Sequence, residues 1–252
     1  MIPSILHQTW KTSPPPREYM ATWQHFNPGL ECRFYDDQDC HNFVVDEFPH
    51  LVELYDSFPL AIERVDLFRY LVVYRCGGWY ADLDMECLRS MRELLQVRGA
   101  VFCIEAHLTP ERQKELSYRH PYQIANCIFA AEAGHPFLQG LIKCVAAWEH
   151  SPALSDERKV EDITGPRMLT RRLYQQASGR LQILPQICWL SPRWYPNIFP
   201  VNIHMYARHH FWGTWKAEPE SRRTIRQRWI ERDRLANPFA SIDSPARPSG
   251  QE

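Results

Sequence analysis

The clearest pattern of apolar and polar positions lies in residues 61–86, AIERVDLFRYLVVYRCGGWYADLDME. From Ile62 to Val73 apolar side chains recur at helical spacing, which predicts a helix with one apolar face. Gly77-Gly78 predicts the end of this helix, because glycine readily takes the left-handed conformation that closes one. Trp79, Tyr80 and Ala81 then predict a short strand that ends at the triplet Asp82-Leu83-Asp84.

Similar patterns divide the rest of the chain. Strands are predicted at residues 2–10, 31–35, 100–106, 126–131 and 181–184. Helices are predicted at residues 17–26, 36–58 with a break at Pro49, 88–96, 134–149 and from Pro166 to 177. This alternation is typical of an α/β fold, a mostly parallel central sheet flanked by helices. Residues 107–122 are polar without periodicity, and we interpret them as a loop or lid that contacts an acceptor.

The composition excludes some classes of protein. The 252 residues carry a net charge of −1, which argues against a nucleic-acid binder. The eight cysteines form no CxxC pair, so we expect reduced, mostly buried thiols in a cytosolic protein. We expect no signal peptide, and no apolar run approaches the roughly 20 residues that a membrane span needs.

The last part of the chain differs from the α/β part, which we place at residues 1–216. Residues 217–236 contain several arginines around Trp229 and Ile230 and predict a basic helical extension, while residues 237–252 predict a disordered tail. The basic helix is either a solvated surface helix or a contact for an anionic membrane face. We therefore expect a cytoplasmic protein, peripheral at the inner face of the cell membrane if the second alternative holds.

The two aspartates after the central strand are the first candidates for chemistry. In a strand, residues i and i+2 point to the same side, so Asp82 and Asp84 can offer two carboxylates to one place. Mg²⁺ or Mn²⁺ in such a site completes its shell with water and substrate phosphates. Open α/β sheets bind ligands at the carboxyl ends of their strands. The pattern thus predicts a metal-bound diphosphate.

The triplet alone is weak, since about one Asp-x-Asp is expected by chance in a chain of this length. The chain carries a second copy, Asp37-Gln38-Asp39, in a polar stretch typical of a solvated turn or a helix N-terminus. The surroundings, rather than the triplet, favour the copy at Asp82.

Other side chains extend the candidate site. Asp66 and Arg69 are three residues apart and share a helix face, either as a surface ion pair or as ligand contacts. The carboxyl end of the first strand offers a base or ribose pocket, with a core tryptophan and a satisfied histidine as the alternative. Its residues are His7, Gln8, Thr9 and Trp10.

Several of these motifs together resemble a known family. IPSILHQTW at residues 2–10, ERVDLFRYLVVYRCGGWYADLD, TGPRMLT at 164–170 and YARHHFWGTWK at 206–216 resemble the DXD sugar-transferase family, glycosyltransferase family 32. The family includes fungal initiating mannosyltransferases and bacterial capsule and lipopolysaccharide transferases, and it is distantly similar to the large clostridial glucosylating toxins. The resemblance covers residues 1–216 and implies a GT-A type, Rossmann-like fold.

The resemblance also implies an activity. It implies a Mn²⁺- or Mg²⁺-dependent, retaining transfer of a hexose or N-acetylhexosamine from a UDP- or GDP-sugar to a glycan or lipid-linked acceptor. Two alternatives stay open, a metal-dependent hydrolase of glycosidic or sugar-phosphate bonds and a non-catalytic sugar-binding module with a vestigial site.

The resemblance assigns roles to individual residues. Asp84 binds the ion directly, Asp82 contacts the ion's water or the ribose, and Asp66 and Arg69 hold the donor's ribose and sugar. His210, five residues before Trp215, is the further metal ligand, and Trp215 closes over the phosphates. The other implied donor contacts are Trp10 against the base, Tyr80, Asn126, Thr164 and Gly165.

Overall fold

The computed structural model describes residues 1–17, 19–147, 157–190 and 204–213. Within these residues the main sheet has seven strands in the order β2-β1-β3-β7-β5-β6, with β8 paired to β5. A second sheet pairs β4 with β9. The strands are β1 Ile5–Thr9, β2 Glu31–Tyr35, β3 Gly78–Ala81, β4 Met85–Cys87, β5 Ala100–His107, β6 Tyr122–Ile124, β7 Ile128–Ala131, β8 Leu181–Leu184 and β9 Ala207–His209.

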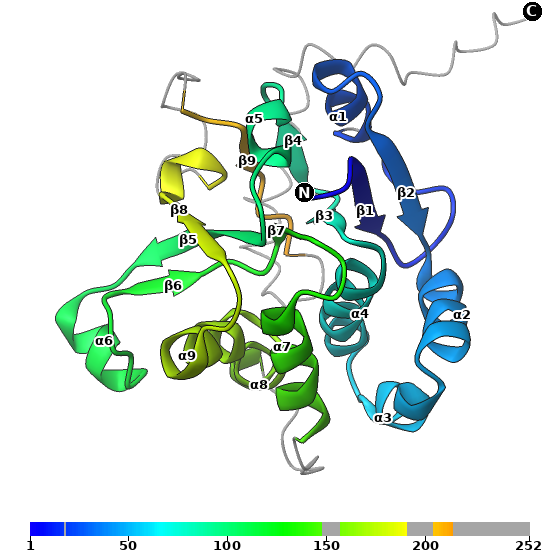
Figure 1. Ribbon diagram of the computed structural model, residues 1–252. Helices are drawn as coiled ribbons and strands as arrows, with labels where there is room; N and C mark the ends of the chain where they lie inside the picture. Colours follow the sequence, from blue (N-terminus) through cyan, green and yellow to red (C-terminus); the bar gives the residue numbers. More distant parts are fainter. Residues whose placement is uncertain (18, 148–156, 191–203, 214–252) are drawn as a thin grey trace, which may run out of the picture.

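The strand directions bring several carboxyl ends to one edge. β1 is parallel to both β2 and β3, and β5 is parallel to β8, whereas β7 runs antiparallel to β3 and β5. The sheet is therefore mixed, and these pairings give β1, β2, β3 and β5 the same direction in the twisted sheet. Figure 1 shows the order of the strands. Since β2 and β3 lie on opposite sides of β1, the sheet has a topological switch point at β1, where open α/β sheets bind their ligands.

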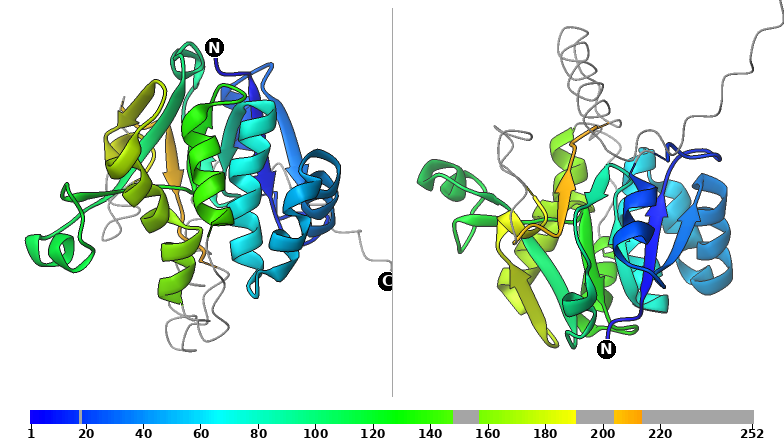
Figure 2. Two further views of the ribbon diagram at one scale, coloured as in Figure 1. Left: turned by 60° about the horizontal axis from the view of Figure 1, so that its bottom comes forward. Right: turned by 90° about the horizontal axis from the view of Figure 1, so that it is seen from above.

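Helices cover both faces of the sheet. The helices are α1 Met20–Phe26, α2 Asp37–Glu47, α3 Val52–Ser57, α4 Ala61–Cys76, α5 Arg92–Leu95, α6 Pro110–Glu115, α7 Pro136–Ala146, α8 Glu157–Ile163 and α9 Pro166–Gln176, with 3-10 turns at Pro49–Leu51 and Gln186–Cys188. Helices α4 and α7 lie side by side over one face (Figure 2). The apolar core on that face includes Phe68, Leu71 and Phe137, and a second core on the other face includes Trp23, Trp79 and Trp189.

Helix α4 is the central helix that the sequence predicts, and it ends where the glycines are. Its last turn is closed at Gly77, which has φ of 68° and whose N–H donates to Val73 O. A Cβ at Gly77 would lie 2.9 Å from the backbone nitrogen of Ala133, so a larger residue does not fit. The prediction of a helix, a glycine stop and a strand is confirmed, and the break at Pro49 between α2 and α3 is confirmed as well.

One predicted loop has more structure than expected. Residues 107–122 form a hairpin connection between β5 and β6 that contains α6, because Pro110 starts a helix that Thr109 caps. The expected extension at 217–236 and the tail at 237–252 lie outside the described residues. In the part of the chain that the structure describes, no helix has the length and apolar character of a membrane span.

Candidate active site

The site lies at the switch point of the sheet, where β1 and β3 end. The hydroxyl oxygens of Thr9 on β1 and Tyr80 on β3 are 2.9 Å apart, which joins the two strands near this edge. Tyr80 also donates its hydroxyl to Asp82 Oδ1 at 3.0 Å. The first aspartate of the triplet is thereby fixed relative to both strands.

The two aspartates converge through a turn and not through the alternation of a strand. β3 ends at Ala81, and Met85 N donates to Asp82 O at 3.0 Å, so residues 82–85 form a tight turn into β4. The expected strand geometry for Asp82 and Asp84 is therefore wrong, although their carboxylates do meet. Ligand atoms of Asp82, Asp84 and His209 all lie within 4.8 Å of one another.

His209 reaches the aspartates through the small sheet of β4 and β9. In the antiparallel register, Met85 faces His209, and His209 Nε2 lies 3.2 Å from Asp84 Oδ1. The other oxygen of Asp84 accepts the Trp212 N–H at 2.7 Å. Phe211 has φ of 51°, a left-handed conformation that is uncommon for a bulky residue and that turns the chain back towards Asp84.

The neighbouring histidine differs from our expectation. His210 Nε2 lies 2.9 Å from Glu86 Oε2, and its ring stacks on Tyr19 with a centroid distance of 4.1 Å. Adjacent residues of a strand point to opposite sides, so only one of the two histidines can face the aspartates. The structure places His209 there and His210 beside Glu86, which favours His209 over the expected His210 as a metal ligand.

The charges of the cluster follow from its burial. Burial raises the pKa of Asp84, but the neighbouring His209 and the Trp212 N–H outweigh it, so this pKa lies below its ordinary value. Burial raises the pKa of Asp82 above its ordinary value against the opposing effect of Arg69. Carboxylate oxygens and an imidazole nitrogen at this spacing fit a divalent cation such as Mn²⁺ or Mg²⁺.

Arg69 links the aspartates to a second, buried group. Its Nη2 lies 3.4 Å from Asp82 Oδ1 and 3.1 Å from Asp66 Oδ1, and its Nη1 donates to Asn126 O at 2.9 Å. The guanidinium also lies 4.7 Å from the centroid of the Tyr80 ring. The surface ion pair that the sequence left open for Asp66 and Arg69 is thus a buried one.

Residues distant in the sequence complete the environment of Asp66. Asn126 Nδ2 donates to Asp66 Oδ1 at 2.9 Å, and Thr164 Oγ1 donates to Asp66 Oδ2 at 2.9 Å. Burial raises the pKa of Asp66 to about 6 against these hydrogen bonds and against Arg69. The structure brings Asp66, Arg69, Asn126 and Thr164 together.

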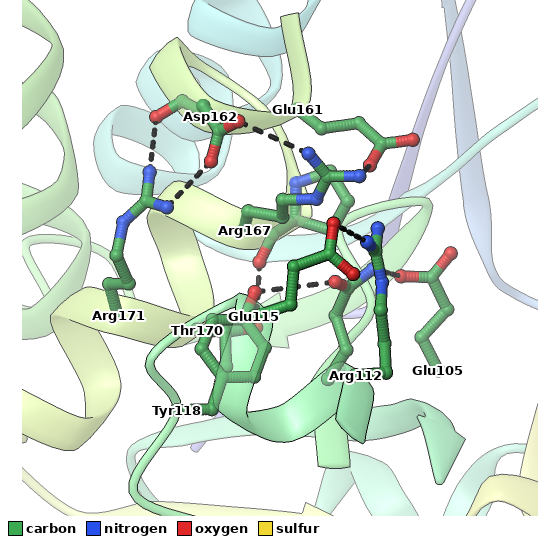
Figure 3. A network of polar contacts seen from close by, with 11 residues as sticks. Glu105, Arg112, Glu115, Tyr118, Glu161, Asp162, Arg167, Thr170 and Arg171 are labelled. Atoms are coloured by element: carbon green, nitrogen blue, oxygen red, sulfur yellow. Dashed lines mark hydrogen bonds and ion pairs between the residues drawn. The ribbon is translucent and has the colours of Figure 1, made fainter. Parts of the chain in front are cut away.

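The turn that carries Thr164 is held by charged side chains of α8 and α9. Arg167 lies 2.7 Å from a carboxylate oxygen of Glu161 and 3.1 Å from one of Asp162, and Arg171 lies 2.6 Å from Asp162 (Figure 3). Position 165 in this turn has no room for a side chain, because a Cβ there would lie 2.8 Å from Glu161 Cα. The network fixes the turn whose Thr164 hydroxyl reaches Asp66.

Of the residues expected to form a base pocket at the end of β1, only some lie towards the site. His7 is fully buried, and its ring bonds Gly77 O at 3.0 Å and the Tyr35 hydroxyl at 3.1 Å, so it faces the fold and not the site. Gln8 is also buried, and its Nε2 has no partner among the described residues. Trp10 is half-buried and lies edge-on to Trp212 at 6.1 Å. Trp215 lies outside the described residues.

Sequence reasoning missed His209, Glu86 and Trp212 as members or supports of the cluster. All three lie in segments that the sequence had singled out, but their roles depend on the pairing of β4 with β9. Nothing in the local pattern of residues 206–216 predicts that pairing.

Comparison with a solved structure gives the fold class. The galactosyltransferase LgtC, solved in complex with donor and acceptor sugar analogs, matches with a TM-score of 0.52 at 10% identity, covering 97% of this chain and 98% of that one. The described architecture is therefore an α/β fold of the GT-A type, a mixed sheet flanked by helices, as expected.

Comparison with sequences gives the family. Residues 8–99 match the glycosyltransferase sugar-binding region containing the DXD motif, which confirms the resemblance to this family, glycosyltransferase family 32. It is 31% identical over 175 residues to inositol phosphoceramide mannosyltransferase 3 of Schizosaccharomyces pombe, covering 67% of this chain and 44% of the relative. It is 29% identical over 161 residues to the initiation-specific alpha-1,6-mannosyltransferase of Candida albicans, covering 56% and 41%. The chain thus spans less than half the length of these relatives.

Proposed function

We propose that this protein is a metal-dependent glycosyltransferase that moves a hexose or N-acetylhexosamine from a nucleotide diphosphate sugar to a lipid-linked or glycan acceptor. The observation that carries the proposal is the convergence of Asp82, Asp84 and His209 beside Arg69 at the switch point of the sheet. The names of the relatives, mannosyltransferases of inositol phosphoceramide and of an initiating step, support a mannosyl group and a lipid or glycan acceptor.

Asp82, Asp84 and His209 would hold the cation. When bound, a Mn²⁺ or Mg²⁺ ion supplies positive charge to the diphosphate that leaves. The chain itself holds the two carboxylates in place before the ion binds. His209 and Trp212 N fix Asp84, and Tyr80 and Arg69 fix Asp82. A preorganised site of this kind needs little rearrangement when charge develops.

Asp66 and Arg69 would orient the donor. Arg69 is 2% exposed and has polar partners on two sides, so its positive charge has a fixed position at the edge of the site. Removing one partner of a buried pair leaves an uncompensated charge at a cost of about 3–5 kcal/mol. The pair of Asp66 and Arg69 therefore keeps one geometry in which it would contact the donor sugar.

Retention of anomeric configuration is part of the proposal. Asp66 and Asp84 are each held on both oxygens, by Asn126, Thr164 and Arg69 in one case and by His209 and Trp212 N in the other. Carboxylates occupied in this way are poor nucleophiles, which favours a same-face transfer over a double displacement. The anomer of the product, read by NMR, tests this point.

A hydrolase is the alternative, and the geometry disfavours it. Paired-carboxylate hydrolysis needs an acid and a base that flank the bond from opposite sides. Asp82 and Asp84 share one tight turn, an arrangement that suits a cation better.

The test is release of nucleoside diphosphate from a panel of UDP- and GDP-sugars with Mn²⁺. Turnover should stop on chelation, and Asp84→Asn should lower it about 100-fold or more. Asp46→Asn, an exposed carboxylate on α2, is the matched control and should leave turnover unchanged. Turnover that survives both chelation and Asp84→Asn would refute the proposal.

A further inference from the structure

Glu105 lies at a bulge near the carboxyl end of β5. In the antiparallel pairing of β5 with β6, Ile104 faces Ile124 and Ala106 faces Gln123, so Glu105 is an extra residue between two consecutive pairs. A bulge re-aims the side chain that it contains, and bulges are frequent beside active sites. Since β5 has the same direction as β1 and β3, Glu105 lies towards the sheet edge that carries the proposed metal site.

Two glutamines hold Glu105 in one position. Gln123 Nε2 donates to Glu105 Oε2 at 2.6 Å, and Gln186 Nε2 donates to the backbone oxygen of Glu105 at 2.7 Å. Gln123 is itself fixed, because its Oε1 accepts the Tyr118 hydroxyl at 3.3 Å. An amide that donates on one side and accepts on the other has a single orientation, so the carboxylate of Glu105 is held in place before any ligand binds.

The same hydrogen bonds connect Glu105 to the turn that carries Thr164. The Tyr118 hydroxyl also contacts the hydroxyl of Thr170 on α9 (Figure 3). Thr170 Oγ1 in turn donates to Pro166 O at 2.7 Å, two residues after Thr164. The position of Glu105 is therefore tied to the turn that carries one of the expected sugar contacts.

Glu105 lies near the residues that would hold the donor sugar. Its partner Gln123 precedes Asn126 by three residues, and Asn126 contacts both Asp66 and Arg69. Three residues of fully extended chain span at most about 11 Å. A ring bound at Glu105 would therefore be next to a sugar held at Asn126.

The metal cluster and Glu105 have a common neighbour in Cys127. Asp82 N donates to Cys127 O at 2.8 Å, so Cys127 lies directly beside the Asp-x-Asp triplet. Burial raises the pKa of the Cys127 thiol well above its ordinary value, and the carboxylates of Asp82, Glu105 and Asp84 raise it further. Because charges shift a pKa only from nearby, these three carboxylates lie around one thiol.

A carboxylate in this position fits hydroxyl groups. It only accepts hydrogen bonds, and its two oxygens can accept from two neighbouring hydroxyls of a ring. A phosphate at the same place is disfavoured, because two anions at short distance repel each other. Asp82 and Asp84 belong to the proposed cation site and Asp66 to the proposed donor contacts, whereas Glu105 belongs to neither group.

We propose that Glu105 binds the acceptor through two neighbouring hydroxyl groups of a polyol ring, such as a sugar or an inositol, beside the donor sugar. Gln123 and Tyr118 set the direction of its carboxylate. This proposal rests on the proposed function, and it names the part of the acceptor that enters the site.

Transfer to small polyols tests the proposal on the full chain. The probes are methyl α-D-mannopyranoside, methyl β-D-galactopyranoside and myo-inositol, each with Mn²⁺ and the nucleotide sugar that binds best, and mass spectrometry detects the product. At least one probe should be glycosylated. Glu105→Gln should raise the KM of that probe about tenfold or more, because an amide accepts at one atom only. The affinity for the nucleotide sugar, measured by calorimetry, should stay within about twofold.

The variant should fold, since its amide oxygen can still accept the hydrogen bond from Gln123. Glu105→Asp keeps both carboxylate oxygens, and the KM of this second variant should lie between those of the wild type and Glu105→Gln. Glu53→Gln, at an exposed position of α3, is the matched control and should leave the KM and the affinity unchanged.

Monodeoxy analogues of the accepted probe separate a contact from a structural role. The wild type should discriminate about tenfold or more against the analogue that lacks a bound hydroxyl, and Glu105→Gln should lose most of this discrimination. A residue that only supports the hairpin would change the KM of every analogue by the same factor.

Several outcomes would overturn the acceptor assignment alone. They are an unchanged KM in Glu105→Gln, an equal change for all analogues, or no glycosylated probe although a nucleotide sugar binds with Mn²⁺. Failure of every UDP- and GDP-sugar to bind with Mn²⁺ would overturn the proposed function together with it.

Discussion

Acid should destabilise the protein through one buried histidine. His7 is neutral in the fold, where its Nε2–H donates to Gly77 O and its Nδ1 accepts the Tyr35 hydroxyl. Burial lowers the pKa of His7 from 6.5 to about 4. Between these two pH values the unfolded chain binds a proton that the folded protein does not, so stability falls as the pH falls.

The size of the effect follows from the pKa shift. One pKa unit corresponds to about 1.4 kcal/mol, so His7 accounts for about 3 kcal/mol of unfolding free energy over the whole window and about 2 kcal/mol between pH 7 and pH 5. For a chain of this size 2 kcal/mol lowers the melting temperature by about 4–8 °C.

Urea denaturation at pH 7, 6 and 5 measures this contribution. His7→Gln should be less stable than the wild type at pH 7, since it loses hydrogen bonds, but it should lose about 2 kcal/mol less on going to pH 5. The exposed His50→Gln is the control and should keep the wild-type dependence. Equal pH dependence in the wild type and His7→Gln would refute the reasoning, and a weaker nucleotide affinity of His7→Gln at pH 7 would place the ring in the donor site after all.

Three further predictions concern the site and its frame. His209→Ala should weaken Mn²⁺ binding more than tenfold in a titration followed by electron paramagnetic resonance, and His210→Ala should weaken it less; the reverse order would favour His210 as the ligand. Thr164→Val, which removes the hydrogen bond to Asp66, should lower the free energy of unfolding by about 1.5–3 kcal/mol, and an unchanged urea midpoint would count against that bond. Asp36→Ala should cost about 1 kcal/mol through loss of the helix cap, whereas Asp37→Ala should change stability by less than about 0.5 kcal/mol; equal losses would show that both serve the cap.

The local elements could be predicted because their causes are local. The spacing of apolar residues in α4 and the pair Gly77-Gly78 define a helix and its end without reference to the rest of the chain. Glu31–Tyr35 and Leu181–Leu184 are strands as predicted, and Pro49 separates α2 from α3 because proline disfavours a continuing helix.

Features that depend on distant partners could not be predicted in the same way. Asp82 and Asp84 meet in a turn whose hydrogen bond from Met85 to Asp82 has no signature in the triplet. Which of the two adjacent histidines faces Asp84 is set by the register of β9 on β4. His7 alternates as a strand residue should, but β1 is buried on both faces, so alternation does not say which side meets a ligand.

The family resemblance supplied what periodicity could not. It pointed to Asn126 and Thr164 as donor contacts, as it did to Asp66, from which 60 and 98 residues separate them in the chain. The structure shows that Asn126 and Thr164 each donate a hydrogen bond to the buried carboxylate of Asp66.

The pairing of β4 with β9 has a consequence for synthesis. Asp84 and Trp212 are 128 residues apart, and the ring of His209 arrives with the same late segment. A ribosome therefore has to deliver nearly the entire α/β domain before the proposed cation site is complete. A nascent chain that stalls before this segment emerges can fold its main sheet, since domains fold from the N-terminus as they are made, but it will lack His209 and Trp212 beside Asp84.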